Sequence, residues 1–196
     1  MKKLLAVALL GLMLAGCSGV PLTSYGKLAR LDPMTAEPRD LRVAVMTSDA
    51  VDLTPGKVDL VMSYLAEDGS LDESHSLVVR PDDTPAFSSR LTRDLEPGFA
   101  VDTFELSAAN ADTMRGFQQR VRNFKAGDGE GEGTLSVSVN GFCTTRDAAA
   151  EDLPFAVYLK TSPEDDFFPM LRGDLKELFA DSGADASQIP RCGEDA

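Results

Sequence analysis

Tryptophan is absent from this chain, histidine occurs once, and only three tyrosines occur among its 196 residues. Sugar-binding surfaces usually offer aromatic side chains as stacking platforms, so these absences argue against carbohydrate recognition. The single histidine, His75, stands between Ser74 and Ser76 with no cysteine nearby that it could activate. One histidine and three cysteines also provide no cluster with metal-ligand spacing. We therefore expect neither a histidine-based metal site nor catalysis by His75.

Basic side chains are also few, since 19 Lys and Arg stand against 32 Asp and Glu, a formal net charge of −13. Such an acidic surface repels nucleic acid and anionic lipid headgroups before contact, so nucleic acid is excluded as a partner. The apolar content of 43% is too high for a disordered chain. The length suffices for one domain with a sizeable core.

Catalytic motifs are missing as well. The chain has no Gly-x-Ser-x-Gly elbow, no Ser-x-x-Lys, no HExxH, no phosphate-binding loop and no dinucleotide glycine pattern. Paired acids occur at Asp82-Asp83 and Glu164-Asp165-Asp166, in proline-flanked loops where carboxylates usually face water. A carboxylate-dependent hydrolase stays open as an alternative, because a sequence does not show whether two acids converge across a cleft. Our first expectation is a chain without enzymatic activity and without a cofactor.

What the chain does have is a distinctive beginning. Lys2 and Lys3 precede an apolar run, Leu4–Leu14, which is too short to span a bilayer as a helix. The run ends in Leu14-Ala15-Gly16-Cys17, with a small residue where a signal peptidase would cut. This arrangement resembles the lipobox of bacterial lipoproteins. The alternative is an ordinary secretory signal with an incidental cysteine.

The resemblance implies a lipid anchor. In that family the cysteine after the cut, here Cys17, takes a diacylglyceryl group on its sulfur, the preceding peptide is removed, and the new amine is usually acylated. Two or more acyl chains hold a protein stably on a membrane. Ser18 stands where an aspartate would favour the inner membrane, so the resemblance implies an outer-membrane lipoprotein facing the periplasm.

Three parts of the chain follow from this interpretation: a signal peptide over 1–16, a lipidated cysteine and tether over 17–40, and one globular domain over 41–196. As a flexible coil the tether would separate its ends by roughly 25–30 Å, which clears the headgroups. Removal of the leader leaves 17 basic against 32 acidic side chains, a net charge of −15. The tether is marked by three prolines, Pro21, Pro33 and Pro38.

The remaining two cysteines, Cys143 and Cys192, are expected to form a disulfide, because an exported protein folds in an oxidising compartment. The bridge would close a loop of about 50 residues and stabilise the fold by about 4 kcal/mol on the chain-entropy model. Two free buried thiols are the alternative. A metal site is not expected from two cysteines so far apart.

Hydrophobic periodicity predicts an α+β fold, an antiparallel sheet or sandwich of about six strands with two helices packed on it. A turn with Gly69 is expected to join the second and third strands as a hairpin. The first helix carries an apolar stripe, and the second is expected to start near Pro169 and stop at Gly183. The expected strands are 41–46, 58–65, 75–80, 100–106, 135–140 and 155–159, and the first helix is 110–125.

The first expected helix carries positive charge on its outer surface, at Arg115, Arg120, Arg122 and Lys125. In so acidic a protein this local excess could receive an anionic partner, either a lipid headgroup or the acidic face of another protein. A partner contact there is our main functional hypothesis, although such a helix more often pairs with neighbouring carboxylates of its own chain. The oligomeric state is left open.

A run of acids and glycines after this helix starts like a calcium loop, with Asp128, Glu130 and Glu132 at positions 1, 3 and 5. Position 12 is Val139 where a bidentate glutamate belongs, so a solvated connector between helix and strand is expected instead. Taken together, the sequence favours a membrane-anchored accessory or interaction module. A periplasmic ligand- or cation-binding protein is the alternative.

Overall fold

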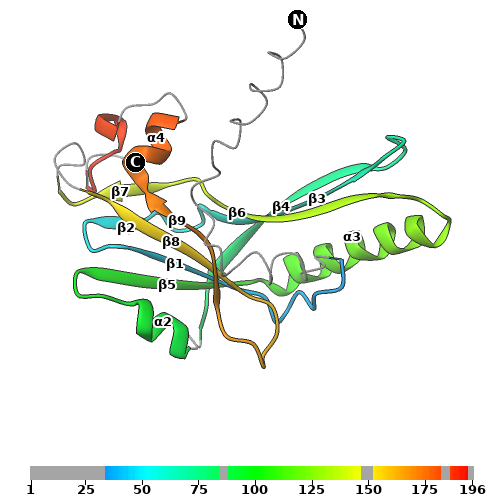
Figure 1. Cartoon of the computed structure of the whole chain (residues 1–196), viewed down its shortest axis with the longest axis horizontal. Helices are drawn as coiled ribbons and strands as arrows, with labels where there is room; N and C mark the ends of the chain where they lie inside the picture. The colour runs from blue at the N-terminus through cyan, green and yellow to red at the C-terminus, as the bar shows by residue number, and fades with distance from the viewer. Residues whose placement is uncertain (1–33, 84–87, 147–151, 182–185, 194–196) are drawn as a thin grey trace, which may run out of the picture.

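The computed structural model describes residues 34–83, 88–146, 152–181 and 186–193. The fold is α+β with the sheet dominant, which confirms the predicted class, and all strand pairs that form its two sheets are antiparallel (Figure 1). The strands are β1 (Arg42–Ser48), β2 (Val51–Leu53), β3 (Val58–Ala66), β4 (Asp72–Pro81), β5 (Phe99–Leu106), β6 (Gly131–Val139), β7 (Phe142–Thr144), β8 (Pro154–Lys160) and β9 (Phe168–Asp174). The helices are α2 (Ser89–Asp94), α3 (Ala108–Ala126), α4 (Leu175–Asp181) and the short 3₁₀ helix η1 (Ala186–Gln188).

Seven strands form the main sheet in the order β6-β3-β4-β5-β1-β8-β9, and β2 and β7 form a small second sheet. The register joins β4 to β5 only over Val79–Pro81, whereas β6 pairs with β3 along its full length. The main sheet therefore has two parts. We call β3, β4, β6 and α3 the extension, which projects from the rest in Figure 1, and the remaining elements the body.

Strand β1 lies in the middle of the body and is buried on both faces. Val43 and Val45 point into the main core, while Ala44 and Met46 point into a second, smaller core. The alternation follows from the two-residue period of a strand, and the second core explains why this segment has almost no polar face.

Helix α3 packs on the inner face of the extension. Its buried stripe, Met114, Phe117 and Val121, lies in one core with Leu60 and Met62 of β3. This confirms the helix predicted over 110–125, although it begins earlier because the Ser107 side chain accepts a hydrogen bond from the Asn110 N–H and caps the first turn. The hairpin between β3 and β4 is also confirmed, with Gly69 at φ 71°.

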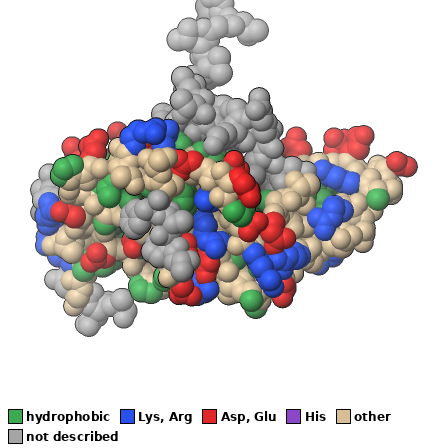
Figure 2. Space-filling model, turned by 90° about the horizontal axis from the view of Figure 1, so that it is seen from below, with side chains coloured by type: hydrophobic (Ala, Val, Ile, Leu, Met, Phe, Trp, Pro, Cys, Tyr) green, Lys and Arg blue, Asp and Glu red, His purple; other side chains and the backbone are tan. Residues whose placement is uncertain are grey.

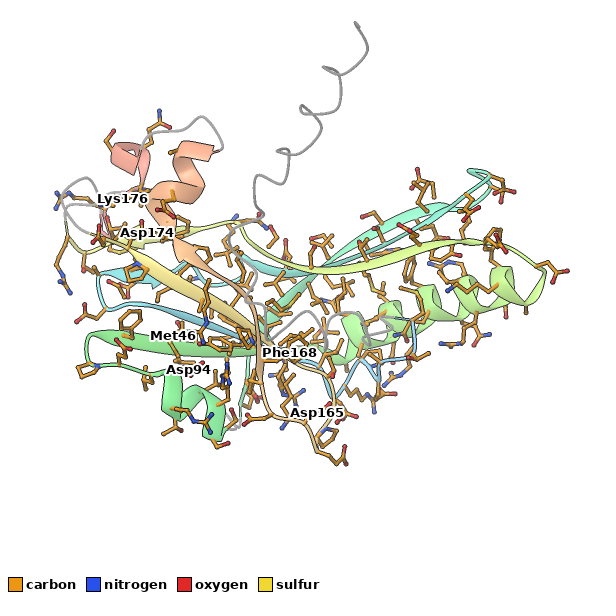
Figure 3. The ribbon with its side chains drawn as sticks, in the orientation of Figure 1. Met46, Asp94, Asp165, Phe168, Asp174 and Lys176 are labelled. Atoms are coloured by element: carbon orange, nitrogen blue, oxygen red, sulfur yellow. A yellow bond between two sulfur atoms is a disulfide. The ribbon has the colours of Figure 1, made fainter. Side chains whose placement is uncertain are left out.

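The second predicted helix is wrong at its start. Pro169 lies in β9, and the helix begins only at Leu175. Proline is tolerated there because β9 is an edge strand that pairs with β8 alone, and the register with β8 is irregular beside it, between Val157 and Tyr158. Asp174 then starts the helix by accepting the Lys176 N–H (Figure 3). Gly183, the predicted stop, lies outside the described residues.

The glycine-rich run after α3 is expected from the sequence to be a connector that reaches Gly133. This expectation is wrong for its last three residues, because they already belong to β6. Strand β6 begins at Gly131, where a Cβ atom would lie 2.4 Å from the backbone oxygen of Leu65. The missing side chain allows β3 and β6 to pair closely at this point. The sequence pattern also missed β2, β7, β9 and α2, which are short or interrupted by proline and glycine.

The last seven residues of the expected tether belong to the folded part of the molecule, and the first four of them lie against the extension. Met34 is 3% exposed and its sulfur-bearing end lies against Gly133, while Ala36 contacts the main core. The predicted leader, Cys17 and the tether up to Pro33 lie outside the described residues. Within the described ranges, no helix is sufficiently long and apolar to cross a bilayer.

Candidate functional site

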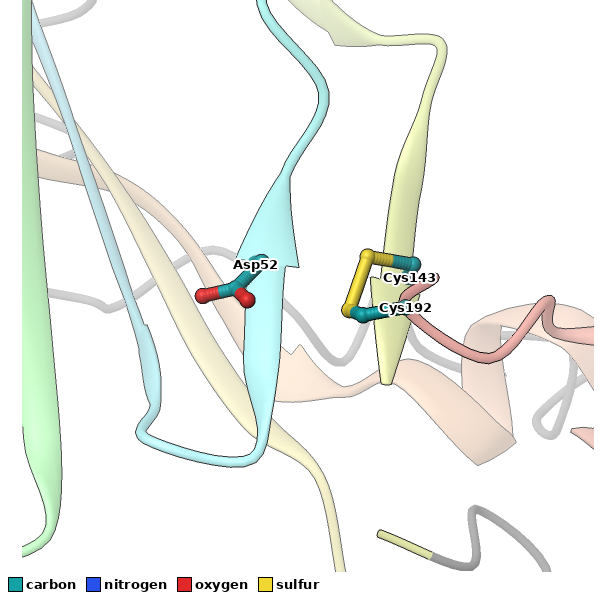
Figure 4. Close-up of side chains that lie close together, drawn as sticks. All are labelled: Asp52, Cys143 and Cys192. Atoms are coloured by element: carbon teal, nitrogen blue, oxygen red, sulfur yellow. A yellow bond between two sulfur atoms is a disulfide. The ribbon is translucent and has the colours of Figure 1, made fainter. Parts of the chain in front are cut away.

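The structure places Cys143 and Cys192 in a disulfide, with Cα atoms 5.0 Å apart. The bridge fastens β7 to the segment after η1, and Asp52 of β2 lies opposite it (Figure 4). Asp52 and the two cysteines are the one group of three potential metal ligands found in the described part of the chain. The two sulfur atoms are bonded to each other, so they are not the thiolates that a metal would need.

The acidic run that resembles a calcium loop does not converge. Asp128, Glu130 and Glu132 are all exposed, and Asp128 adopts a left-handed backbone with φ 64°. Glu132 belongs to β6 and points to the face of the sheet away from α3. Within the described ranges these three acids form no group that could hold a cation.

The four cationic side chains of α3 contact groups of the chain itself. Two of them hold the segment before β1: Arg115 pairs with Glu37 and with Asp112, and the Arg122 Nη1 donates to the Met34 carbonyl at 3.0 Å. Hydrogen bonding to Arg115 lowers the pKa of Glu37 below its ordinary value. These contacts match the alternative in which the helix pairs with its own neighbours.

The other two cations contact β4 and β3. Arg120 donates to both oxygens of Glu73, at 3.0 and 2.7 Å, and Lys125 lies 5.6 Å from the centre of the Tyr64 ring. His75 joins this group, since its Nε2 lies 3.3 Å from Glu73 and its ring packs edge-on against Phe117. The hydrogen bond from Arg120 lowers the pKa of Glu73. Viewed from below, Lys and Arg alternate with Asp and Glu along the extension, so this side is not a cationic patch (Figure 2).

Of the paired acids, Asp82 departs most from the expectation of a solvated loop. Its side chain is 2% exposed and accepts from Arg42 Nε at 3.1 Å, where β1, β4 and β5 meet. Asp83 is exposed and pairs with Arg80. Asp82 thus stabilises the junction of the extension and the body, which is a structural role, whereas Asp83 forms a surface ion pair.

The second acidic cluster caps a helix. Asp166 accepts from the Ser89 hydroxyl at 2.8 Å and from the Arg90 N–H at 3.2 Å. Burial alone would raise the pKa of Asp166, but these hydrogen bonds, with those of Ser88 and the Phe167 N–H, outweigh it and lower the pKa. Phe167 and Phe168 after it are buried, so they add nothing to the surface.

One pair of acids does interact unfavourably. The pKa of Asp102 on β5 is raised, first by partial burial of its carboxyl and then by the negative charge of Asp52. Both residues are nevertheless exposed overall. A carboxylate-dependent hydrolase would need two acids that converge across a cleft, whereas these two residues are exposed, so the pair by itself does not support catalysis.

A polar cluster that the sequence pattern missed lies under α2. Tyr158 is 1% exposed, and its hydroxyl donates to Asp94 Oδ2 at 3.1 Å. Asp94 also pairs with Arg90 at 3.0 Å and with Arg172. Figure 3 shows Asp94 on the same side of the sheet as Met46 of the second core. Arg90 and Asp94 form an i,i+4 pair within α2, whereas Tyr158 and Arg172 come from β8 and β9, so local spacing reveals only the helical pair and not the cluster that fastens α2 to the sheet.

The most distinctive surface is the outer face of the extension, on the side of the sheet opposite α3. Its centre contains only hydroxyl and aliphatic side chains, and the cross-strand register brings them side by side. Neighbouring hydroxyls bond to each other, as Ser63 and Thr134 do at 2.7 Å. We call this surface the hydroxyl face; it consists of Val61, Ser63, Leu65, Ser74, Ser76, Val78, Thr134 and Ser136.

The hydroxyl face also exposes apolar area. Leu65 is 56% and Val78 is 46% exposed, and they are two of the three large hydrophobic side chains exposed in the described part of the chain. Charges stand in its end rows: Asp59 lies opposite Val78, with Arg80 next along β4, and at the other end Asp72 and Glu132 lie opposite Leu65. The sequence signal for it was the alternation of Ser with Leu and Val in 134–139, which predicts a strand with one polar face.

Comparisons of the chain with protein-family models, with curated proteins and with solved structures find no significant match.

Proposed function

We propose that this chain is a lipid-anchored, non-catalytic interaction module of the bacterial cell envelope that contacts a protein partner through the hydroxyl face. The observation that carries the proposal is an uncharged centre of hydroxyl and aliphatic side chains in a chain of net charge −13. Protein interfaces are depleted of charged residues at their centre and have a polar rim; here Leu65 and Val78 add exposed apolar area beside the carboxylates at the two ends. A partner can approach the uncharged centre without desolvating ions.

The choice of surface changes once the structure is considered. The cations of α3 are engaged with Glu37, Glu73 and backbone carbonyls, so binding there would first break those contacts. The hydroxyl face requires no such rearrangement. Its hydroxyls, each of which both donates and accepts, suit a polar but uncharged partner surface.

A site-specific photo-crosslinker tests the surface. A benzophenone side chain is placed at Ser74 on the hydroxyl face, and the matched control carries it at Thr113, which is also exposed but lies on α3 at the opposite side. After irradiation of whole cells we expect a discrete adduct with another protein from Ser74 and none from Thr113. The Leu65→Asp substitution should reduce the Ser74 adduct at least fivefold. Equal adducts from both positions would contradict the proposal.

The anchor is tested separately. The support for it is the lipobox resemblance at Leu14-Ala15-Gly16-Cys17, followed by a serine. We expect the mature chain to begin at Cys17 with a mass increased by a diacylglyceryl group and an acyl chain, and to fractionate with the outer membrane. A Cys17→Ser chain should be found outside the membrane fraction or keep its leader. An unmodified sulfur at Cys17 in the wild-type chain would contradict the anchor.

A further inference from the structure

Strand β6 is an unusual edge strand. The main sheet ends at β6 on one side and at β9 on the other, and each pairs with one neighbour within the described ranges. Exposed edges invite pairing with another chain, and proteins usually protect them with proline, charged side chains or bulges. Strand β9 has all three: Pro169, Arg172 and Asp174, and the irregular register with β8.

By contrast, β6 has none of these protections apart from one charge. Its sequence contains no proline, lysine or arginine, only Glu132 is charged, and its nine residues pair with β3 in unbroken register. The same sheet is thus protected at one edge and left regular at the other. This contrast favours pairing of the free edge of β6 with a strand of another chain.

The backbone groups on the free side of β6 can be assigned. The Asn140 N–H donates to the Lys57 carbonyl at 2.6 Å, and the Glu67 N–H donates to the Glu130 carbonyl at 2.9 Å. Both bonds continue the register of β3 and β6, so the even-numbered residues of β6 direct their backbone groups toward β3. The odd-numbered ones direct theirs to the free side, namely Gly131, Gly133, Leu135, Val137 and Val139.

We propose that two copies of this chain pair their β6 strands antiparallel, with Ser136 on the twofold axis, to form one continuous sheet. In this register the odd residues bond to each other across the interface. Leu135 lies opposite Val137 on the inner face, and Thr134 lies opposite Ser138 on the outer face. Glu132 lies opposite the Asn140 amide, so each side chain meets one of matching chemistry.

The charges favour a second copy as the occupant despite the acidity of the chain. The two Glu132 carboxylates would stand about 27 Å apart along the paired strands, well beyond the screening length in physiological salt. The interface itself then contains no like charges in opposition. This inference goes beyond the proposed function, because it concerns the backbone edge of β6, although Thr134 and Ser136 of that strand also belong to the hydroxyl face.

Cysteine crosslinking in cells tests the pairing with the full chain. Residue 136 would face its own copy in a non-hydrogen-bonded pair, with Cα atoms about 4.5 Å apart, which suits a disulfide. The matched control is Ser74→Cys, also exposed on the same side of the extension but about 28 Å from its copy, since five strand spacings and an offset of about four residues separate the two. After mild oxidation we expect at least ten times more disulfide dimer from Ser136→Cys than from Ser74→Cys, with the parent chain as the blank.

A second pair of variants tests the register. Thr134→Cys and Ser138→Cys chains, carrying different tags and expressed together, should crosslink to each other, while neither should crosslink to itself. A Ser136→Cys yield no higher than that of Ser74→Cys would overturn the pairing, and so would self-crosslinking of Thr134→Cys. Because these disulfides join only copies of this chain, their absence would leave the photo-adducts from Ser74 with another protein unaffected.

Discussion

The Tyr158 hydroxyl donates to Asp94 Oδ2 at 3.1 Å, and this bond links β8 to the end of α2. The Arg172 Nη2 lies 3.1 Å from the same hydroxyl, and its guanidinium lies 5.6 Å from the centre of the Tyr158 ring. A phenol that is both buried and hydrogen-bonded to a carboxylate keeps its proton strongly. The Tyr158 pKa is raised to about 12, chiefly by burial.

Stability at high pH should therefore depend on Tyr158. The folded chain holds this proton up to about pH 12, whereas the unfolded chain releases it near the ordinary pKa of about 10. The contribution of Tyr158 is present in full below pH 10 and is lost as the pH rises toward 12. Urea unfolding should show wild type more stable than Tyr158→Phe by about 1–2 kcal/mol at pH 8. A difference that stayed constant up to pH 12 would contradict this account.

Asp82 and Asp83 form a matched pair of neighbouring acids in different surroundings. Asp82 is buried against Arg42, so Asp82→Asn should lower the free energy of unfolding by about 1–3 kcal/mol, because it removes a buried charge-assisted hydrogen bond and leaves Glu105 as the carboxylate that pairs with Arg42. The Asp83 side chain is 75% exposed, and Asp83→Asn should change stability by less than about 0.5 kcal/mol. Chemical denaturation at pH 7 checks both values. Equal effects would show that the junction does not depend on Asp82.

Two glycines should respond oppositely to alanine. At Gly131 a Cβ atom would lie 2.4 Å from the Leu65 oxygen and 2.7 Å from the Ala66 Cα, and backbone atoms cannot move aside cheaply. We expect Gly131→Ala to destabilise the fold by about 2 kcal/mol or more. Gly116 lies inside α3 with its nearest contact at 3.6 Å, so Gly116→Ala should stabilise by about 0.5–1 kcal/mol. Thermal denaturation of both variants would reveal shifts of opposite sign.

The disulfide should contribute through the long segment that it closes. Cys143 and Cys192 are 49 residues apart, so replacing both with serine should lower the free energy of unfolding by about 4 kcal/mol on the chain-entropy model. Peptide mapping without reductant should recover the two cysteines in one linked pair. Free thiols at both positions in protein isolated from cells would contradict the bridge.

Local pattern was sufficient for much of the fold. The stripe of Met114, Phe117 and Val121 predicted α3, and the alternation in β3 and β8 predicted those strands to within a residue or two. In α3 and β3 a long buried face repeats over many residues, and in β8 large side chains at every second position enter the main core while Ala156 and Tyr158 enter the second. Gly69 likewise predicted the hairpin, because its positive φ is a local requirement.

The rest depended on contacts between distant parts of the chain. Pro169 usually favours a helix start, but here an edge strand accepts it because the missing N–H is not needed there. Asp82 is buried only because Arg42 reaches it from another strand. The cations of α3 are similarly engaged by Glu37 and Glu73, 78 and 47 residues away. Helix periodicity predicts that these side chains point outward, but it does not reveal what meets them.

The fastening of residues 34–37 to α3 determines how tension would travel through the molecule. The side chains of Arg115, Gln118 and Arg122 grip this segment, and Leu41 leads from it into β1, which is hydrogen-bonded on both sides. A force applied at the N-terminal side would thus first load the contacts of these α3 side chains with residues 34–37. Strand β1 would bear the load only after these side-chain contacts had broken. The contacts between residues 34–37 and α3 would therefore protect the central strand from a force applied at the N-terminal side.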